Sequence, residues 1–323
     1  MIVFGAHPDG PVHQATLASD VAEVDILSYG AILRDWRVKT PTGWRTVTLG
    51  FDTFEPYLAN PRSFGIVAGR VVNRIRGARF TLDGVEHRLE ENRPPHHIHG
   101  GSNGIGKRLW TMEATSKGVR LTIDSEDGDM GYPGHARITV DFRLDGAALT
   151  FDMTGEVDRP GPISLAQHSY YNLSGAQTVE DHVFQVPASR RTALDDAFVA
   201  TGALVDVAPY DARTPRRVGT QPLDLNYCLD PRPADEPAGR VSAGGLALTL
   251  HTDQPGLQVY NAFNMTDVGA PGLGGRHYGA FAGLALEAQH WPNAVHHPHF
   301  PSVIARPGAP YRQTTTVTIA PEL

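Results

Sequence analysis

Apolar and polar residues alternate with a period of two along much of the chain, a pattern typical of half-buried β-strands. Residues 137–144 carry apolar side chains on one face and polar or charged ones on the other (Ile138, Val140, Phe142 and Leu144 against Arg137, Thr139, Asp141 and Arg143). Asp145-Gly146 follows, and the alternation resumes at Leu149, Phe151 and Met153. Because Asp-Gly between two alternating runs favours a tight turn, this region predicts an antiparallel hairpin.

Other segments repeat this pattern. Further strands are predicted at Val119–Ile123, Leu246–Leu250 and Thr314–Ile319, with a second hairpin tip at Leu82–Val85. No long helical pattern is visible, and 34 glycines and 25 prolines are scattered among the short strands. These features favour an all-β fold, one large antiparallel β-sandwich, over alternating β-α units.

We expect residues 1–323 to form a single domain, although the length alone would also allow two small ones. Residues 206–240 are rich in Pro, Asp and Arg, and we interpret them as a long surface excursion rather than a linker. The hydrophobic fraction of 41% is sufficient for a substantial core.

Charge and composition exclude several classes of partner. A formal net charge of -7 argues against binding to nucleic acid or to an anionic membrane surface, since both require clustered Lys and Arg. Residues 1–13 lack the basic and apolar regions of a signal peptide, and no apolar run is long enough to span a bilayer. We therefore expect a cytoplasmic protein. Cys228 is the single cysteine, so it forms no intrachain disulfide, and we interpret it as a buried structural thiol.

Three stretches contain histidines that could take part in chemistry: His96-His97-Ile98-His99, His168 in Gln167-His168-Ser169, and His296-His297-Pro298-His299. On a strand, His97 and His99 would point to the same face, a spacing compatible with metal binding. Histidines in exposed loops beside Pro94, Pro95 and Pro298 are commonplace, however, so we do not predict a metal site. Gly100, Gly101, Gly104 and Gly106 resemble a phosphate-binding loop only superficially, because the strand and helix that such a loop requires are not visible.

Glu287 interrupts the apolar run Gly283-Leu284-Ala285-Leu286, which otherwise indicates a buried strand. Burial of an unpaired carboxylate costs several kcal/mol, roughly, so such a residue is usually paired with a cation or functional. A carboxylate combined with an imidazole could catalyse reversible opening of a cyclic hemiacetal: one group removes the anomeric hydroxyl proton and the other protonates the ring oxygen. This reaction needs no cofactor.

Several sequence motifs resemble those of a known enzyme family. In order and spacing, they closely resemble the signature regions of the aldose 1-epimerase (galactose mutarotase) family, from about Ser28 to the C-terminus: Gly69-Arg70-Val71-Val72-Asn73-Arg74-Ile75, Ile98-His99-Gly100-Gly101, Lys107-Arg108-Leu109-Trp110, Gly128-Asp129-Met130-Gly131-Tyr132-Pro133-Gly134, Gln167-His168-Ser169-Tyr170-Tyr171-Asn172-Leu173, Leu223-Asp224-Leu225-Asn226-Tyr227, Pro255-Gly256-Leu257-Gln258 and Leu286-Glu287-Ala288-Gln289-His290-Trp291-Pro292.

The resemblance implies a large β-sandwich, the galactose mutarotase-like supersandwich, with the sugar bound in an open cleft. It places the general base on Glu287, the general acid on His168 and a second active-site histidine on His99. The residues it implies for hydrogen bonding to the sugar are Arg74, Asp224 and Gln258, with Asn73 as an accessory. It implies an aldose as substrate, a hexose or a pentose, and no cofactor or metal. The sequence is silent on oligomeric state, and we expect a monomer or homodimer.

Some alternatives stay open at this stage. From its residue type alone, Arg74 could equally belong to a surface ion pair. Ala288 and His296-His297 depart from the family pattern and lie close in sequence to Glu287, which leaves the preferred aldose open. The competing functions are a non-catalytic sugar-binding protein, a mutarotase acting on hexose phosphates and a metal-dependent hydrolase; retention of both acid and base argues against the first.

Overall fold

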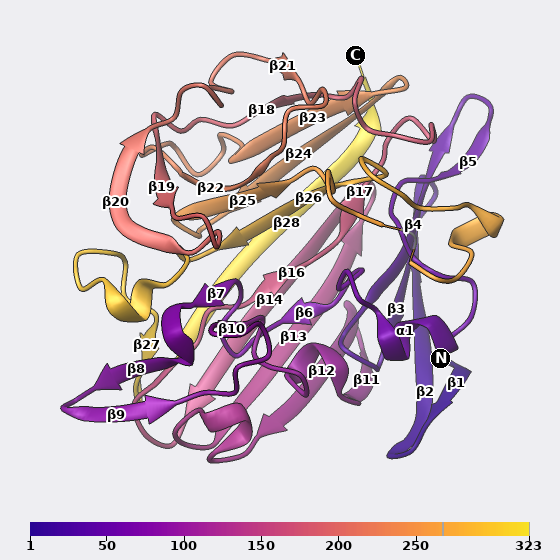
Figure 1. Ribbon diagram of the computed structural model, residues 1–323. Helices are drawn as coiled ribbons and strands as arrows, with labels where there is room; N and C mark the ends of the chain where they lie inside the picture. The colour runs from indigo at the N-terminus through magenta and orange to yellow at the C-terminus, as the bar shows by residue number, and fades with distance from the viewer. Residues whose placement is uncertain (267, 323) are drawn as a thin grey trace.

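β-Strands make up three large sheets in the computed structural model, which describes residues 1–266 and 268–322 (Figure 1). A five-stranded sheet runs in chain order through β1 (Ile2–His7), β2 (Gly10–Ala18), β3 (Ala22–Leu27), β4 (Leu33–Thr40) and β5 (Gly43–Thr46). A nine-stranded sheet has the order β11 (Thr111–Thr115), β12 (Gly118–Ser125), β13 (Ala136–Asp145), β14 (Ala148–Val157), β28 (Tyr311–Pro321), β24 (Leu246–Thr252), β23 (Gly239–Ala243), β18 (Val183–Gln185) and β21 (Arg216–Arg217).

The third sheet has six strands, in the order β17 (Tyr170–Tyr171), β26 (Leu284–Gln289), β25 (Gly256–Tyr260), β22 (Asp224–Cys228), β19 (Arg190–Leu194) and β20 (Ala200–Asp206). Four pairs of short strands complete the fold: β6 (Val67–Ala68) with β16 (Ala166–Gln167), β7 (Arg74–Ile75) with β10 (His97–Ile98), β8 (Arg79–Leu82) with β9 (Val85–Arg88), and β15 (Gly161–Pro162) with β27 (Ile304–Ala305). Within the described residues, the single α-helix is α1 (Glu55–Ala59), and 3-10 turns include η1 (Arg76–Ala78) and η5 (Ala294–His296).

The alternating patterns fold as predicted. β13 and β14 form the antiparallel hairpin, with Asp145 opposite Ala148 at its turn. The second predicted hairpin tip joins β8 and β9, where Leu82 pairs with Val85. The predicted strands in residues 119–123, 246–250 and 314–319 lie within β12, β24 and β28. The all-β prediction is therefore confirmed.

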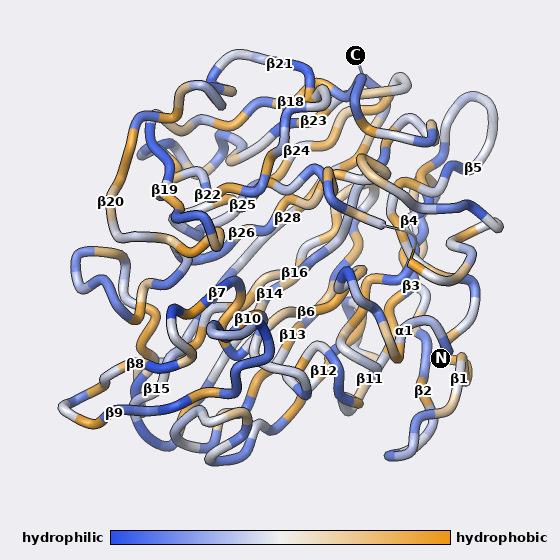
Figure 2. Tube along the Cα trace, in the orientation of Figure 1, coloured by the Kyte–Doolittle hydropathy of each residue, from blue (hydrophilic) through white to orange (hydrophobic). Residues whose placement is uncertain are grey.

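One cluster of buried side chains joins the three large sheets. It includes Trp36 from the five-stranded sheet, Ile138 and Val317 from the nine-stranded sheet, and Val259 and Leu286 from the six-stranded sheet. The period-two alternation of the strands directs these apolar side chains inward, and their burial stabilises the sandwich. Figure 2 shows a contrasting hydrophilic tract, between β9 and β10, that lies beside β7.

The interpretation of residues 206–240 as a surface excursion is wrong for their central part. This segment contributes β22, which lies between β25 and β19 and buries Leu225, Asn226 and Tyr227. A strand of five residues, flanked by prolines and charged residues, is too short to show a clear periodicity. No helix in the described ranges is long and apolar enough to cross a membrane.

Candidate active site

The cluster of buried side chains that joins the three large sheets is the main core of the protein. A polar cleft lies on the face of the six-stranded sheet that points away from this core. In β26, Leu284, Leu286 and Ala288 pack into that core, so Glu287 points to the opposite face. Residues directly opposite one another in an antiparallel pair share a face, and two rows cross β22, β25 and β26 in this way. The first row is Asn226, Gln258 and Glu287, and the second is Asp224, Tyr260 and Ala285.

Glu287 and His168 face each other within this cleft, which has a volume of about 280 Å³. Oε1 of Glu287 lies 3.6 Å from Nε2 of His168, and both side chains are buried. Their other polar atoms, Oε2 and Nδ1, are buried without a hydrogen-bond partner in the described part of the chain. Because unpartnered buried polar atoms are costly, their presence in a cleft indicates a site that binds a polar ligand.

Backbone hydrogen bonds hold His168 in place between β16 and β17. Its N–H donates to the carbonyl of Ile66, and its carbonyl accepts from the N–H of Gly65. The His168 ring packs against the Tyr170 ring at a centroid distance of 5.2 Å and against the His99 ring at 5.3 Å. These contacts fix the imidazole before any ligand binds.

His99 follows β10 and has a left-handed backbone, with φ of 51°. Gly100 comes next, and a Cβ there would lie 1.6 Å from the carbonyl oxygen of Gly69, so only glycine fits. The N–H of Asn73 donates to Nδ1 of His99 at 3.3 Å. Because Nδ1 accepts, the hydrogen of the neutral ring is on Nε2, which is then a donor available to a ligand.

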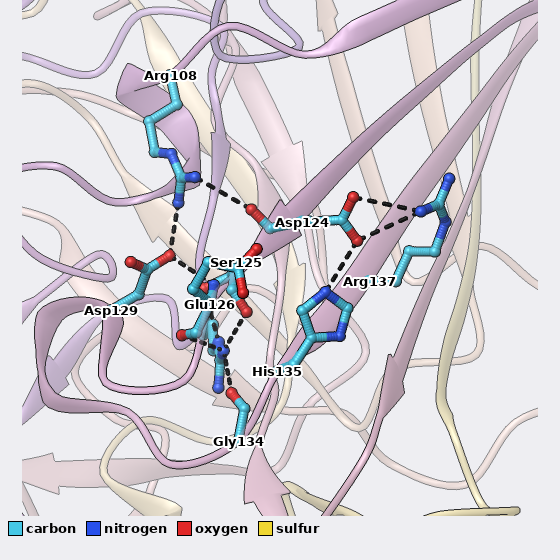
Figure 3. Close-up of polar contacts among 9 residues, drawn as sticks. Arg108, Asp124, Ser125, Glu126, Asp129, Gly134, His135 and Arg137 are labelled. Atoms are coloured by element: carbon cyan, nitrogen blue, oxygen red, sulfur yellow. Dashed lines mark hydrogen bonds and ion pairs between the residues drawn. The ribbon is translucent and has the colours of Figure 1, made fainter.

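The segment that leads to Asn73 rests on a polar network at the turn between β12 and β13. The buried guanidinium of Arg70 donates to the carbonyl oxygens of Ser125, Pro133 and Gly134 at 2.7, 2.9 and 2.5 Å. Figure 3 shows the adjoining contacts of this turn, where Arg108 reaches Asp129 at 2.7 Å and Asp124 at its carbonyl oxygen, 3.1 Å away. The network lies outside the cleft, and it supports the loop that carries the cleft residue Asn73.

Arg74 and Asp224 line the cleft together with Asn73. Gln258 lies beside them, and its Nε2 donates to Oδ1 of Asp224 at 2.7 Å. Burial raises the pKa of Asp224, while the charge of Arg74 and the bond from Gln258 act against that rise. Burial likewise lowers the pKa of Arg74. This group of charged and amide side chains is suited to hydrogen bonding with neighbouring sugar hydroxyls.

Burial shifts the pKa values of Glu287 and His168 in opposite directions. Burial, reinforced by the charge of Asp224 and opposed by Arg74, raises the pKa of Glu287 to about 8. Burial lowers the pKa of His168 to about 4. Both shifts favour the neutral forms, a carboxyl group beside an uncharged imidazole in the ligand-free cleft, and shifts of this kind are typical of acid–base catalysts.

The structure brings the seven residues identified from the sequence to one place. Glu287, His168, His99, Arg74, Asn73 and Asp224 line the cleft, and Gln258 contacts Asp224 from within the same sheet. The sequence reasoning missed a larger set of cleft-lining residues, namely Asn60, Arg62, Ser63, Asn92, Arg93, Lys107, Tyr260 and Asn264. Tyr260 could have been found, because it lies two positions after Gln258 on the same face of β25. Lys107 ends the 3-10 turn η2 (Ile105–Lys107), and the other six lie in loops.

Other candidate residues lie elsewhere. Both ring nitrogens of His97 are occupied, since Nδ1 contacts the carbonyl of Glu90 at 2.7 Å and Nε2 accepts from the hydroxyl of Tyr132 at 2.9 Å. Within residues 1–266 and 268–322, no group of three His, Cys, Asp or Glu side chains could hold a metal ion. Cys228 is buried, as expected, and burial raises the pKa of its thiol to about 12.

The two departures from the family pattern also lie away from the cleft. Ala288 faces the main core, on the opposite side of β26 from Glu287. His297 contacts the carbonyl of Ala200 through Nε2 at 3.3 Å, and His296 belongs to η5. Proximity to Glu287 in sequence was therefore misleading. Ala288 points to the opposite face of the strand, and His296 and His297 lie beyond the end of β26 at Gln289.

Comparison with known proteins identifies the family of this chain. The family model described as aldose 1-epimerase matches residues 13–318. The chain is 36% identical to human galactose mutarotase, covering 97% of this chain and 96% of the relative, and 30% identical to the aldose 1-epimerase of Escherichia coli, covering 95% of each. The solved structure of a GalM/aldose epimerase homologue from C. elegans superimposes with a TM-score of 0.91, at 29% identity over 97% of this chain and 100% of that one. This chain belongs to the aldose 1-epimerase family.

Proposed function

We propose that this protein interconverts the α and β anomers of a free aldose, with Glu287 and His168 as the acid–base pair. The observation that carries the proposal is the 3.6 Å approach of the Glu287 carboxyl group and the His168 imidazole in a polar cleft. Relatives over nearly the whole chain are named galactose mutarotase and aldose 1-epimerase, and their reaction requires such a pair.

The reaction begins with the aldose bound so that C1 faces the pair. Glu287 removes the proton of the C1 hydroxyl, the electron pair of that O–H bond forms the C1 carbonyl, and the bond between C1 and the ring oxygen breaks. His168 gives its proton to the departing ring oxygen. Rotation about C1–C2 presents the other face of the aldehyde, and the ring closes with the two roles reversed.

This chemistry needs the single proton of the pair on His168 and a charged Glu287. In the ligand-free cleft, burial shifts both pKa values toward the opposite arrangement. We therefore propose that a proton passes from Glu287 to His168 as the sugar binds. A transfer over 3.6 Å moves a proton without changing the net charge of the buried cleft. His99 would donate from Nε2 to a sugar oxygen, and Arg74, Asp224, Gln258 and Asn73 would hold the hydroxyls.

The same proposal treats residues 1–323 as one domain, since a single cluster of buried side chains joins the three large sheets. Cytoplasmic location and a monomeric or homodimeric state stay predictions from the sequence. The polarity of the cleft is compatible with hexoses and pentoses alike.

Exchange NMR on freshly dissolved α-anomers of a panel of aldoses tests the proposal. We expect the protein to accelerate equilibration of at least one aldose far above the buffer rate, and exhaustive chelation to leave the rate unchanged, because the proton transfers need no Lewis acid. Binding of sugars without any acceleration would favour a non-catalytic binding protein. A loss of activity on chelation that one metal restores would contradict the acid–base mechanism.

A further inference from the structure

The guanidinium of Arg74 needs a definite orientation if it is to hold a sugar hydroxyl. Its charge interacts with that of Asp224, but no carboxylate oxygen of the described residues lies within the 4.0 Å of an ion pair. The contacts that hold it come from Phe198: Nη1 donates to the Phe198 carbonyl at 3.5 Å, and the guanidinium lies 5.7 Å from the centre of the Phe198 ring. A cation over an aromatic face at this distance is attracted to it.

Phe198 is an unusual residue to find at that position. Its side chain is 40% exposed although it is large and apolar, and its backbone is left-handed, with φ of 60°. A left-handed conformation is costly for a residue with a side chain, so the surrounding structure must impose it. Neither exposure nor strain contributes to stability, which points to a role at the cleft.

Asp195 imposes this conformation on the loop between β19 and β20. Its Oδ1 accepts hydrogen bonds from the N–H groups of Ala197 at 3.0 Å and Val199 at 2.9 Å. Its carbonyl also accepts from the N–H of Phe198 at 2.9 Å. These bonds close a tight turn that presents the ring and the carbonyl of Phe198 on the same side as Arg74.

The loop is also tied to the segment that carries Arg74. Oδ2 of Asp195 accepts from Nη2 of Arg76 at 2.6 Å, and Arg76 lies two residues after Arg74. Asn293 joins the same two segments, because its Oδ1 accepts from the N–H of Arg76 at 3.1 Å and its Nδ2 donates to the carbonyl of Ala200 at 2.8 Å. The positions of the loop and of β7 are therefore set together.

We propose that Phe198 is a positioning residue for the mutarotase reaction, which fixes the guanidinium of Arg74 in the cleft before the sugar binds. The inference rests on the proposed function and adds a residue to it. An arginine that is already oriented loses less conformational freedom on binding, so Phe198 strengthens sugar binding through Arg74 without touching the reacting atoms.

The test compares steady-state anomer exchange of D-galactose, measured by NMR, and D-galactose affinity, measured by calorimetry, in wild type, Phe198→Ala, Phe198→Tyr and Arg74→Ala. We expect Phe198→Ala to raise KM and Kd about two- to fivefold, the usual worth of an exposed cation–π contact, with kcat within about twofold of wild type. Phe198→Tyr keeps the aromatic face, so its KM should stay close to that of wild type. The substitution Trp44→Ala removes another exposed aromatic side chain, 47% exposed and in β5, and should change nothing.

The sugar affinity of the double variant tests more sharply whether Phe198 acts through Arg74. Arg74→Ala with Phe198→Ala should bind no more weakly than Arg74→Ala alone, because Phe198 has nothing left to position. Additive losses, or an unchanged KM and Kd in Phe198→Ala, would overturn the inference. A wild type that binds D-galactose without accelerating exchange would refute the proposed function instead, and the Kd values of the same variants would still decide whether Phe198 positions Arg74.

Discussion

Oε1 of Glu287 lies 3.6 Å from Nε2 of His168, and both side chains are buried in the cleft. Neither group reaches this arrangement by proximity in sequence: Glu287 comes from the centre of β26 and His168 from the connection between β16 and β17. Burial shifts both pKa values in the directions that keep the pair singly protonated over a wide range of pH.

The pH profile of kcat/KM should therefore be a broad bell. Below about pH 4 both groups are protonated and the base is lost, and above about pH 8 the pair loses its proton and with it the acid. The two limbs belong to the coupled pair rather than to either residue. Exchange NMR between pH 3.5 and pH 9.5 measures the profile; a single limb near pH 6.5, the ordinary value for histidine, would show that burial does not tune the pair.

Stability should depend on pH through the same carboxyl group. The pKa of Glu287 rises from 4.5 to about 8 on folding, so its contribution to stability is complete below pH 4.5 and is lost as the pH rises through 8. Glu287→Gln does not titrate, so the free energy of unfolding of wild type relative to this variant should fall between pH 5 and pH 9. Urea unfolding at both pH values measures the difference, with exposed Glu113→Gln as the control; a constant difference would contradict the raised pKa.

Asp224→Ala should weaken sugar binding more than it slows the bound reaction. Asp224 sits with Gln258 and Arg74, and its proposed role is to hold hydroxyls equally in the ground and transition states, so its loss raises KM. We expect KM to rise about tenfold or more, since a hydrogen bond to a charged group is worth roughly 1.5–3 kcal/mol, while kcat changes little. A collapsed kcat at constant KM would assign Asp224 to the chemical step.

The sequence is most informative where a local pattern decides the structure. The alternation in residues 137–144 and the Asp145-Gly146 turn predict β13 and β14 correctly because each face of the hairpin has one environment. The motifs likewise identify Glu287 and His168, which the fold brings within 3.6 Å.

Features that depend on register and loop packing are beyond the reach of the sequence. Ala288 is next to Glu287 in the chain yet belongs to the core, whereas Lys107, at the end of a 3-10 turn, and Arg62, in a loop, line the cleft. The contact of Phe198 with Arg74 joins residues 124 positions apart through a loop conformation that Asp195 imposes. No periodicity in the sequence encodes such contacts.

The central claim is that Glu287 and His168 act as one unit, and the double variant tests it most directly. Glu287→Gln keeps the shape of the side chain but removes its basicity, and His168→Asn removes the titratable proton, so each should lower kcat by about 10²–10⁴. Thermal unfolding of each variant should show that the fold is retained.

The decisive measurement is the kcat of Glu287→Gln with His168→Asn, by exchange NMR under saturating aldose. The account predicts a rate little below that of the slower single variant, because residues acting as a unit are strongly non-additive. Losses that multiply would contradict joint action of the pair, and near wild-type exchange in Glu287→Gln, with sugar binding intact, would contradict the assignment of the base.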